Sequence, residues 1–261
     1  MKIMGILNVT PDSFSDGAKH HTPQLACQHA HQMVREGADI IDVGGESTRP
    51  GHTPISHQEE IERIVPVLDH LHDMGVPLSI DTYKSAVARE AIQHGASIIN
   101  DIWGFQADPE MAKLAAEHQL LSILMHNQST KTYQEDIILS MKRFFDKSIE
   151  LALSAVLKES LIVLDPGIGF GKTWQHNWEV LRRLDEVVAF GFPVLLGTSR
   201  KGMYGGLLNN QVDERMAATL ATSVYAMERG VEYFRVHDVK AHNDARRVWE
   251  RIYDQTDHSR S

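Results

Sequence analysis

Residues 161–172, with the sequence LIVLDPGIGFGK, decide the fold prediction. The first four residues are apolar, which is typical of a strand buried in a sheet. Asp165 follows the apolar run, Pro166 ends the ladder of backbone hydrogen bonds, and three glycines allow backbone conformations that side chains would block. A buried strand that delivers a carboxylate into an open glycine loop suggests the floor of a site for a flat ligand.

Two familiar phosphate-binding motifs are absent from this segment. A P-loop requires Gly-x4-Gly-Lys-Ser/Thr, and residues 171–173 supply its end, but Pro166 stands where the first glycine belongs. A dinucleotide fingerprint requires Gly-x-Gly-x-x-Gly, whereas Gly167, Gly169 and Gly171 are spaced two and two. Taken alone, the segment also fits an ordinary strand-to-helix turn, so the rest of the chain must decide.

Short apolar runs of the same kind recur through the chain, with helical patterns between them. Most of these runs do not alternate with polar residues, which predicts strands buried on both faces of a parallel sheet. Eight strand–helix units of roughly 33 residues each predict an α/β fold, the (β/α)8 or TIM barrel. No break in composition divides the chain, so we expect one domain over residues 1–261 with a frayed tail at about 256–261. The predicted strands are residues 3–9, 39–43, 77–81, 97–101, 120–125, 161–165, 193–197 and 233–236.

The predicted helices carry their own end signals. Ser56 and Glu59 form a capping box at the start of one helix, and Asp213 is expected to cap another. Residues 133–158 form the longest helical stretch, and residues 175–190 predict a single helix.

The composition excludes several classes of function. A net charge of −9 argues against nucleic acid or an anionic membrane as a partner. The chain has no apolar run near the ~18 residues of a membrane span, and its first residues do not form a signal sequence. The single cysteine, Cys27, cannot form an internal disulfide, which favours a cytoplasmic location. It is expected to be a buried structural thiol, and no Cys/His cluster has the spacing of a zinc site.

Every predicted strand ends in polar residues. The active site of a (β/α)8 barrel lies at the carboxyl ends of its strands. Because buried polar groups are costly without a partner, eight converging polar ends favour a ligand site over a set of structural caps. Asp81, Asn100 and Asp165 end strands 3, 4 and 6, and their oxygens suit a heterocycle with adjacent N–H donors, such as a 2-amino-pyrimidinone ring.

A second group of strand ends suits an anion. Arg49, Arg235 and His237 come from strands 2 and 8, which lie close together when a barrel closes, and they favour phosphate or pyrophosphate. Asn8 ends strand 1 beside them, where its neutral oxygen can hold Mg²⁺ that bridges to phosphate. Lys201 follows strand 7 at the start of a helix, a second place for an anion, and nothing nearby supports a Schiff-base role for it. A ring site next to a diphosphate site describes a substrate with a leaving group.

Taken together, these residues resemble the dihydropteroate synthase family over nearly the whole chain. The resemblance implies condensation of 6-hydroxymethyl-7,8-dihydropterin diphosphate with p-aminobenzoate by an SN1-like displacement, a transferase step of folate biosynthesis that sulfonamides target, with Mg²⁺ as cofactor. It also implies a cytoplasmic homodimer packed through residues 213–230 and 239–254. The matching blocks are MGILNVTPDSFSDG at residues 4–17, DVGGESTRPG at 42–51, IDT at 80–82, NDI at 100–102, DPGIGFGK at 165–172, SRK at 199–201 and RVHDV at 235–239.

The resemblance also implies a role for each site residue. Asp81, Asn100, Asp165 and Lys201 would bind the pterin, and two loops would close over p-aminobenzoate. The residues implied to bind substrate are Phe14, Thr48, Pro50, Asp81, Asn100, Ile102, Met125, Asp165, Gly169, Phe170 and Ser199. The residues implied to act in catalysis are Asp16, Arg49, Lys201, Arg235 and His237, and the residue implied to hold the metal is Asn8.

Two departures from the family pattern leave alternatives open. Ala18 follows Gly17 where the family usually has two glycines, and Gly202 follows Lys201 where many members carry serine. One alternative is a catalytically silent paralogue that only binds a pterin. Another is a methyltransferase that passes a methyl group from a methylated folate to a corrinoid protein, although such an enzyme has no use for a diphosphate cluster.

Overall fold

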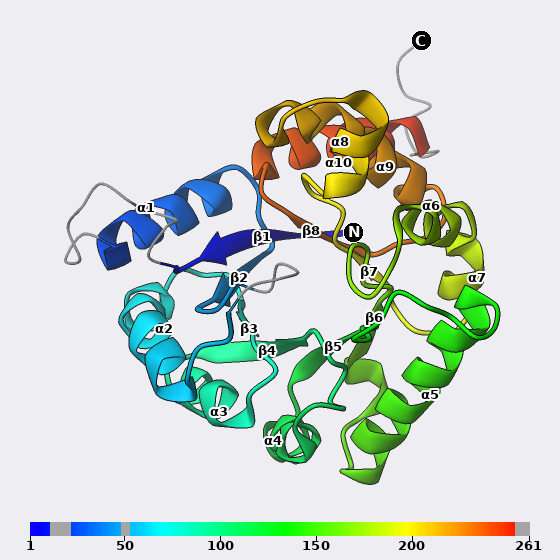
Figure 1. Cartoon of the computed structure of the whole chain (residues 1–261). Helices are drawn as coiled ribbons and strands as arrows, with labels where there is room; N and C mark the ends of the chain where they lie inside the picture. The colour runs from blue at the N-terminus through cyan, green and yellow to red at the C-terminus, as the bar shows by residue number, and fades with distance from the viewer. Residues whose placement is uncertain (11–21, 48–52, 254–261) are drawn as a thin grey trace.

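The computed structural model describes residues 1–10, 22–47 and 53–253, and in these residues eight parallel strands form a barrel inside a ring of helices (Figure 1). The strands follow the order β6-β5-β4-β3-β2-β1-β8-β7, and an isolated bridge between Leu164 and Val194 joins the two ends. The predicted (β/α)8 barrel is therefore confirmed. The strands are β1 (Lys2–Asn8), β2 (Ile40–Gly44), β3 (Leu78–Asp81), β4 (Ala96–Asp101), β5 (Leu121–Met125), β6 (Ile162–Asp165), β7 (Leu195–Leu196) and β8 (Tyr233–Val236).

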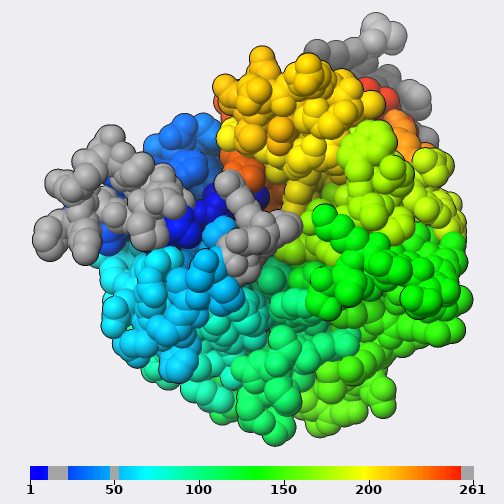
Figure 2. Space-filling view, in the orientation of Figure 1, coloured from blue at the N-terminus to red at the C-terminus, as the bar shows by residue number. Residues whose placement is uncertain are grey.

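The chain runs once around the barrel, from blue through cyan and green to yellow, in the ribbon and space-filling views (Figure 1, Figure 2). The α-helices that surround the strands are α1 (Thr22–Arg35), α2 (His57–Leu71), α3 (Ser85–Gln93), α4 (Pro109–His118), α5 (Ile137–Ser154), α6 (Trp174–Arg182), α7 (Leu184–Val188), α8 (Gly202–Leu208), α9 (Met216–Met227) and α10 (Val239–Tyr253). Short 3-10 turns, η2 (Glu159–Leu161) and η3 (Val212–Arg215), precede β6 and α9.

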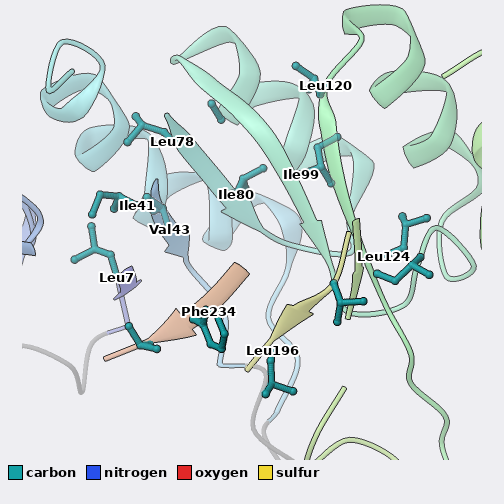
Figure 3. Packing of buried hydrophobic residues seen from close by; sticks show 14 of the residues in the cluster. Leu7, Ile41, Val43, Leu78, Ile80, Ile99, Leu120, Leu124, Leu196 and Phe234 are labelled. Atoms are coloured by element: carbon teal, nitrogen blue, oxygen red, sulfur yellow. The ribbon is translucent and has the colours of Figure 1, made fainter. Parts of the chain in front are cut away.

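Side chains alternate between the inside of the barrel and the layer beneath the helices, because successive residues of a strand point to opposite faces. The outer layer is the larger apolar cluster, and Figure 3 shows part of it, including Ile41, Val43 and Ile80. A smaller cluster fills the lower interior with one residue from each of six strands: Met4, Ile40, Ile98, Ile123, Val163 and Leu195. Residues two positions further along the same strands therefore point into the barrel above this layer, toward the carboxyl ends.

Several predicted ends of helices need correction. Ser56 caps α2 by accepting from the Glu59 N–H, but the Glu59 side chain pairs with Arg63. Asp213 is not a helix cap, because it lies inside the turn η3 and α9 begins only at Met216.

The predicted single helix over residues 175–190 is divided, since Arg183 has a non-helical backbone between α6 and α7. The predicted strand over residues 193–197 is reduced to two residues, Leu195 and Leu196. In the part of the chain that the structure describes, no helix is both long and apolar enough to cross a membrane.

Candidate active site

A cavity of about 1170 Å³ opens at the carboxyl ends of the strands. All the predicted site residues that the structure describes line this cavity: Asn8, Asp81, Asn100, Ile102, Met125, Asp165, Gly169, Phe170, Ser199, Lys201, Arg235 and His237. The other predicted residues lie outside the described residues: Phe14, Asp16, Thr48, Arg49 and Pro50. These residues converge because the side chains of a strand alternate between its two faces. On five of the strands, the inward position above the lower apolar layer carries a polar side chain.

The glycine loop after β6 packs tightly against the end of β5. The Asp165 carboxylate accepts from the Gly167 N–H at 2.7 Å, which folds the loop back over the strand end. Gly167 has a φ of +65°, and a Cβ placed there would lie 2.1 Å from the His126 carbonyl oxygen. Only glycine fits this position, in both its conformation and its space. Burial raises the pKa of Asp165, and the hydrogen bond from Gly167 opposes that shift.

Lys172 lies buried beneath the glycine loop. Its ammonium group donates to the Gly167 and Phe170 carbonyl oxygens at 3.0 and 3.1 Å and lies 2.8 Å from Nδ1 of His126. Burial lowers the pKa of Lys172 to about 7 and that of His126 to about 2. His126 is therefore neutral and can accept from Lys172 through Nδ1. The sequence analysis did not identify this pair, although the position of Lys172 at the end of the glycine loop was visible in the sequence.

A network of charged groups crosses the barrel below the glycine loop. Arg235 donates from Nη2 to Asp81 and from Nε to Asp42, each at 2.6 Å. Asn100 donates from Nδ2 to the same Asp42 oxygen at 3.1 Å. Burial raises the pKa of Asp81 to about 7, while the charge of Arg235 opposes the shift. Two carboxylates thus hold Arg235, which sequence reasoning had assigned to a diphosphate alone.

Asp42 is the residue of this network that sequence reasoning missed. It is fully buried in the middle of β2, at an inward position between Ile40 and Gly44. A charged residue at an inward position of an otherwise apolar strand was the available signal.

Lys201 lies over the glycine loop on the cavity side. Its ammonium group is 4.4 Å from the centre of the Phe170 ring, a cation–π contact, and a Cβ on Gly169 would lie 3.3 Å from it. Burial raises the pKa of Asp165, and the charge of Lys201 opposes that rise and so favours the carboxylate. Ser199, in the segment between β7 and α8, accepts from the His237 N–H at 3.1 Å and lies 2.9 Å from its Nδ1. These contacts join this segment to the end of β8.

Asn8 brings a neutral oxygen to the same floor. A Cβ on Gly44 would lie within 3.8 Å of Asn8 Oδ1 and 3.6 Å of Asp81 Oδ2, so the two side chains border one space. No group of three or more His, Cys, Asp or Glu side chains able to hold a metal occurs among the described residues. This donor set fits Mg²⁺, which commonly takes one or two protein oxygens and completes its shell with phosphate and water.

A cluster of charged side chains holds the segment that follows β2. Lys84 pairs with both Glu46 and Glu60 and donates to the Ile55 carbonyl oxygen, and Tyr83 donates to Glu46 at 2.9 Å. Burial raises the pKa of Glu60, and the hydrogen bond from Lys84 opposes that shift. The cluster ties the residues on both sides of positions 48–52 to the body of the barrel.

Comparisons with known proteins agree with the geometry. Residues 4–237 match the family model described as pterin binding enzyme. A dihydropteroate synthase of Clostridium beijerinckii is 48% identical over 251 residues, which cover 94% of this chain and 92% of that protein. The Clostridium difficile dihydropteroate synthase, solved in the presence of pteroic acid, aligns with a TM-score of 0.95 and 48% identity over 97% of both chains. The Xanthomonas albilineans dihydropteroate synthase, solved with 4-aminobenzoic acid, aligns with a TM-score of 0.92 and 39% identity, over 96% of this chain and 92% of that one.

Proposed function

Because the chain belongs to the pterin-binding enzyme family, as a dihydropteroate synthase, we propose that it joins 6-hydroxymethyl-7,8-dihydropterin diphosphate to p-aminobenzoate and releases pyrophosphate. The observation that carries the proposal is the floor of the cavity, where oxygen-bearing side chains from three strands face one space beside a glycine loop. The relatives solved in the presence of pteroic acid and with 4-aminobenzoic acid support both halves of the substrate pair.

The pterin ring binds on Asp81, Asn100 and Asp165. Their oxygens can accept from the ring N–H groups, and a charged acceptor forms the stronger hydrogen bond. Lys201 lies over the Phe170 ring and borders the same slot. The slot is further lined by Ile102, Met125 and Gly169.

The diphosphate binds at the rim formed by the ends of β1 and β8. Arg235 can donate to the diphosphate through Nη1, because its other two nitrogens already donate to Asp42 and Asp81. His237 and Ser199 add donors at the same rim, and we infer that Arg49 and Thr48 contribute from outside the described residues. Asn8 would hold Mg²⁺, which when bound neutralises part of the diphosphate charge.

The reaction breaks the bond between the pterin methylene carbon and the diphosphate oxygen. The bonding electrons leave with pyrophosphate, whose charge is stabilised by cations around it, and a delocalised pterin cation remains. The arylamine nitrogen then attacks the methylene carbon and loses one proton to solvent or to the departing group. No covalent bond to the protein is needed. We infer that Asp16 stabilises the cation and that Phe14 and Pro50 cover p-aminobenzoate, all three lying outside the described residues.

Two variants separate the ring site from the diphosphate site. Asp165→Ala should raise the KM for the pterin diphosphate chiefly, because a ring acceptor is lost. Arg235→Ala should lower kcat as well, because the charge on the departing group is less well stabilised. Steady-state kinetics on both variants provide the test. Near-normal kinetics for both would contradict the assignment.

We also propose that the chain is a single domain over residues 1–261, that it forms a homodimer and that it is located in the cytoplasm. Large apolar side chains are exposed on the late part of the chain, which supports pairing there: Val212, Met216, Val248 and Ile252. Light scattering during gel filtration should give a mass near twice the 29.4 kDa of one chain. A monomer at micromolar concentration would contradict the dimer.

Cys27 is buried and unpaired, as expected of a structural thiol.

A further inference from the structure

Asp42 occupies a position from which it can control the ring site without touching the ring. It is fully buried on β2, one layer above the lower apolar layer of the barrel, and its neighbours Ile41 and Val43 point to the outer layer. Its Oδ2 atom accepts from both Asn100 and Arg235, whereas Oδ1 has no hydrogen-bond partner among the described residues. A buried carboxylate oxygen without a hydrogen bond lowers the stability of the fold, so stability alone does not explain an aspartate at this position.

The hydrogen bond to Asn100 fixes which end of the amide faces the cavity. An asparagine side chain can present either its carbonyl oxygen or its NH2 group to a ligand. A carboxylate can only accept, so Asp42 holds the NH2 group of Asn100 and leaves the Oδ1 atom for the cavity that Asn100 lines. Asn100 therefore meets a ligand as an acceptor, which matches a ring that presents N–H donors.

The same carboxylate fixes the plane of Arg235. Asp42 and Asp81 hold Nε and Nη2 at 2.6 Å each, so the guanidinium is fixed through two of its three nitrogens. The two carboxylates come from neighbouring strands, and Arg235 comes from the strand on the other side of β1. Asp42 thus connects Asn100, the acceptor of the ring site, with the neighbouring guanidinium group of Arg235.

We propose that Asp42 is a positioning residue that sets the donor–acceptor pattern of the ring site by holding Asn100 as an acceptor. This inference rests on the proposed function, since it concerns recognition of the pterin. Asp42, which is fully buried and does not line the cavity, would then decide whether the site accepts a ring with N–H donors or a ring with acceptors.

The first test is binding of 6-hydroxymethylpterin, which lacks the diphosphate and so reports on the ring site alone. Asp42→Asn keeps the shape but can donate as well as accept, so Asn100 is free to turn. Calorimetry should show the affinity falling by about tenfold. The matched control is Ser79→Ala, because Ser79 is the partner of Asp42 across the β2–β3 ladder, is fully buried and has no hydrogen-bond partner for its hydroxyl among the described residues. Its affinity should stay within about twofold of wild type.

The second test compares two ring ligands on the same variants. 6-Hydroxymethyllumazine presents a carbonyl oxygen where the pterin presents its 2-amino group, so it needs a donor where the pterin needs an acceptor. Asp42→Asn should lower the ratio of pterin affinity to lumazine affinity by about tenfold, because Asn100 can then turn its NH2 group to the cavity, whereas a merely structural role for Asp42 weakens both ligands alike. If Asp42→Asn does not fold, Asp42→Ser is measured in the same way, since serine also releases the Asn100 amide.

The outcomes separate this inference from the proposed function. Normal pterin affinity in a folded Asp42→Asn variant would overturn the positioning role, and so would an equal loss of affinity for the pterin and the lumazine. Failure of the wild-type protein to bind 6-hydroxymethylpterin would instead contradict the ring site itself.

Discussion

Gly167→Ala tests the packing of the glycine loop against β5, and Gly191→Ala is its matched control. Both glycines have positive φ, +65° and +88°, so each substitution places alanine in the left-handed region at a cost of about 1–2 kcal/mol. A Cβ at Gly191 meets nothing within 4 Å, so the control carries the backbone strain alone. A Cβ at Gly167 lies 2.1 Å from the His126 carbonyl oxygen, and His126 is held in the sheet by its N–H bond to the Asp165 carbonyl at 2.9 Å.

Relief of the contact at Gly167 therefore requires the loop to move by about 1 Å, because a Cβ rarely lies within 3 Å of a backbone oxygen. That movement breaks the bonds that Gly167 makes with Asp165 and Lys172, at 2.7 and 3.0 Å. Each bond involves a charged group and is worth about 1.5–3 kcal/mol, so together with about 1–2 kcal/mol of backbone strain the total loss should be about 4–8 kcal/mol. Thermal unfolding should show Tm falling by about 2–8 °C for Gly191→Ala and by about 8–30 °C for Gly167→Ala.

The pterin KM provides a second measurement on the same two variants. Gly167→Ala should raise it, because the loop that carries Gly169 and Phe170 moves with Gly167, whereas Gly191→Ala should leave it unchanged. Equal losses of Tm in the two variants, with equal pterin KM, would refute the idea that close packing of this loop builds the site.

Three further predictions concern charged groups. Because the pKa of Lys172 falls to about 7 in the fold, the unfolded chain binds more protons above that pH, so stability should gain up to about 1 kcal/mol per pH unit as pH rises from 7 to 10. Lys172→Met should flatten this slope in urea unfolding, and parallel slopes would contradict the buried lysine. Lys201→Met removes the cation over Phe170 and beside Asp165, so the pterin KM should rise about tenfold in steady-state assays, and an unchanged KM would count against its place in the ring site. Lys84→Met removes the cation that the buried carboxylates of Glu46 and Glu60 share and should destabilise the fold by about 3–5 kcal/mol; a Tm within about 2 °C of wild type would contradict the buried cluster.

The barrel was predictable from the sequence because its signal is local. Each strand is an apolar run, and the polar residue at its end marks the active-site face of the fold, which is why Asp81, Asn100 and Asp165 were found. Local sequence signals predicted the wrong ends of elements where packing against the rest of the barrel sets them. The strand β7 has only two residues, and α9 begins after a 3-10 turn that contains Asp213, so Asp213 is not at the cap position.

The pairing of the charged residues could not be predicted in the same way. Arg235 and Asp42 are 193 positions apart and meet only because closure of the barrel brings β8 to the side of β1 opposite β2. Sequence reasoning placed Arg235 at the anion site but could not know that two carboxylates hold it. The burial of Lys172 against His126 likewise depends on how the glycine loop folds back over β5.

Synthase activity is measured as pyrophosphate release from 6-hydroxymethyl-7,8-dihydropterin diphosphate, with Mg²⁺ and with or without p-aminobenzoate. We expect release that depends on the amine, forms 7,8-dihydropteroate in equal amount, stops when EDTA removes the metal and returns with added Mg²⁺. Binding of the pterin diphosphate without any release, with the amine and Mg²⁺ present, would contradict it and leave a protein that only binds pterins.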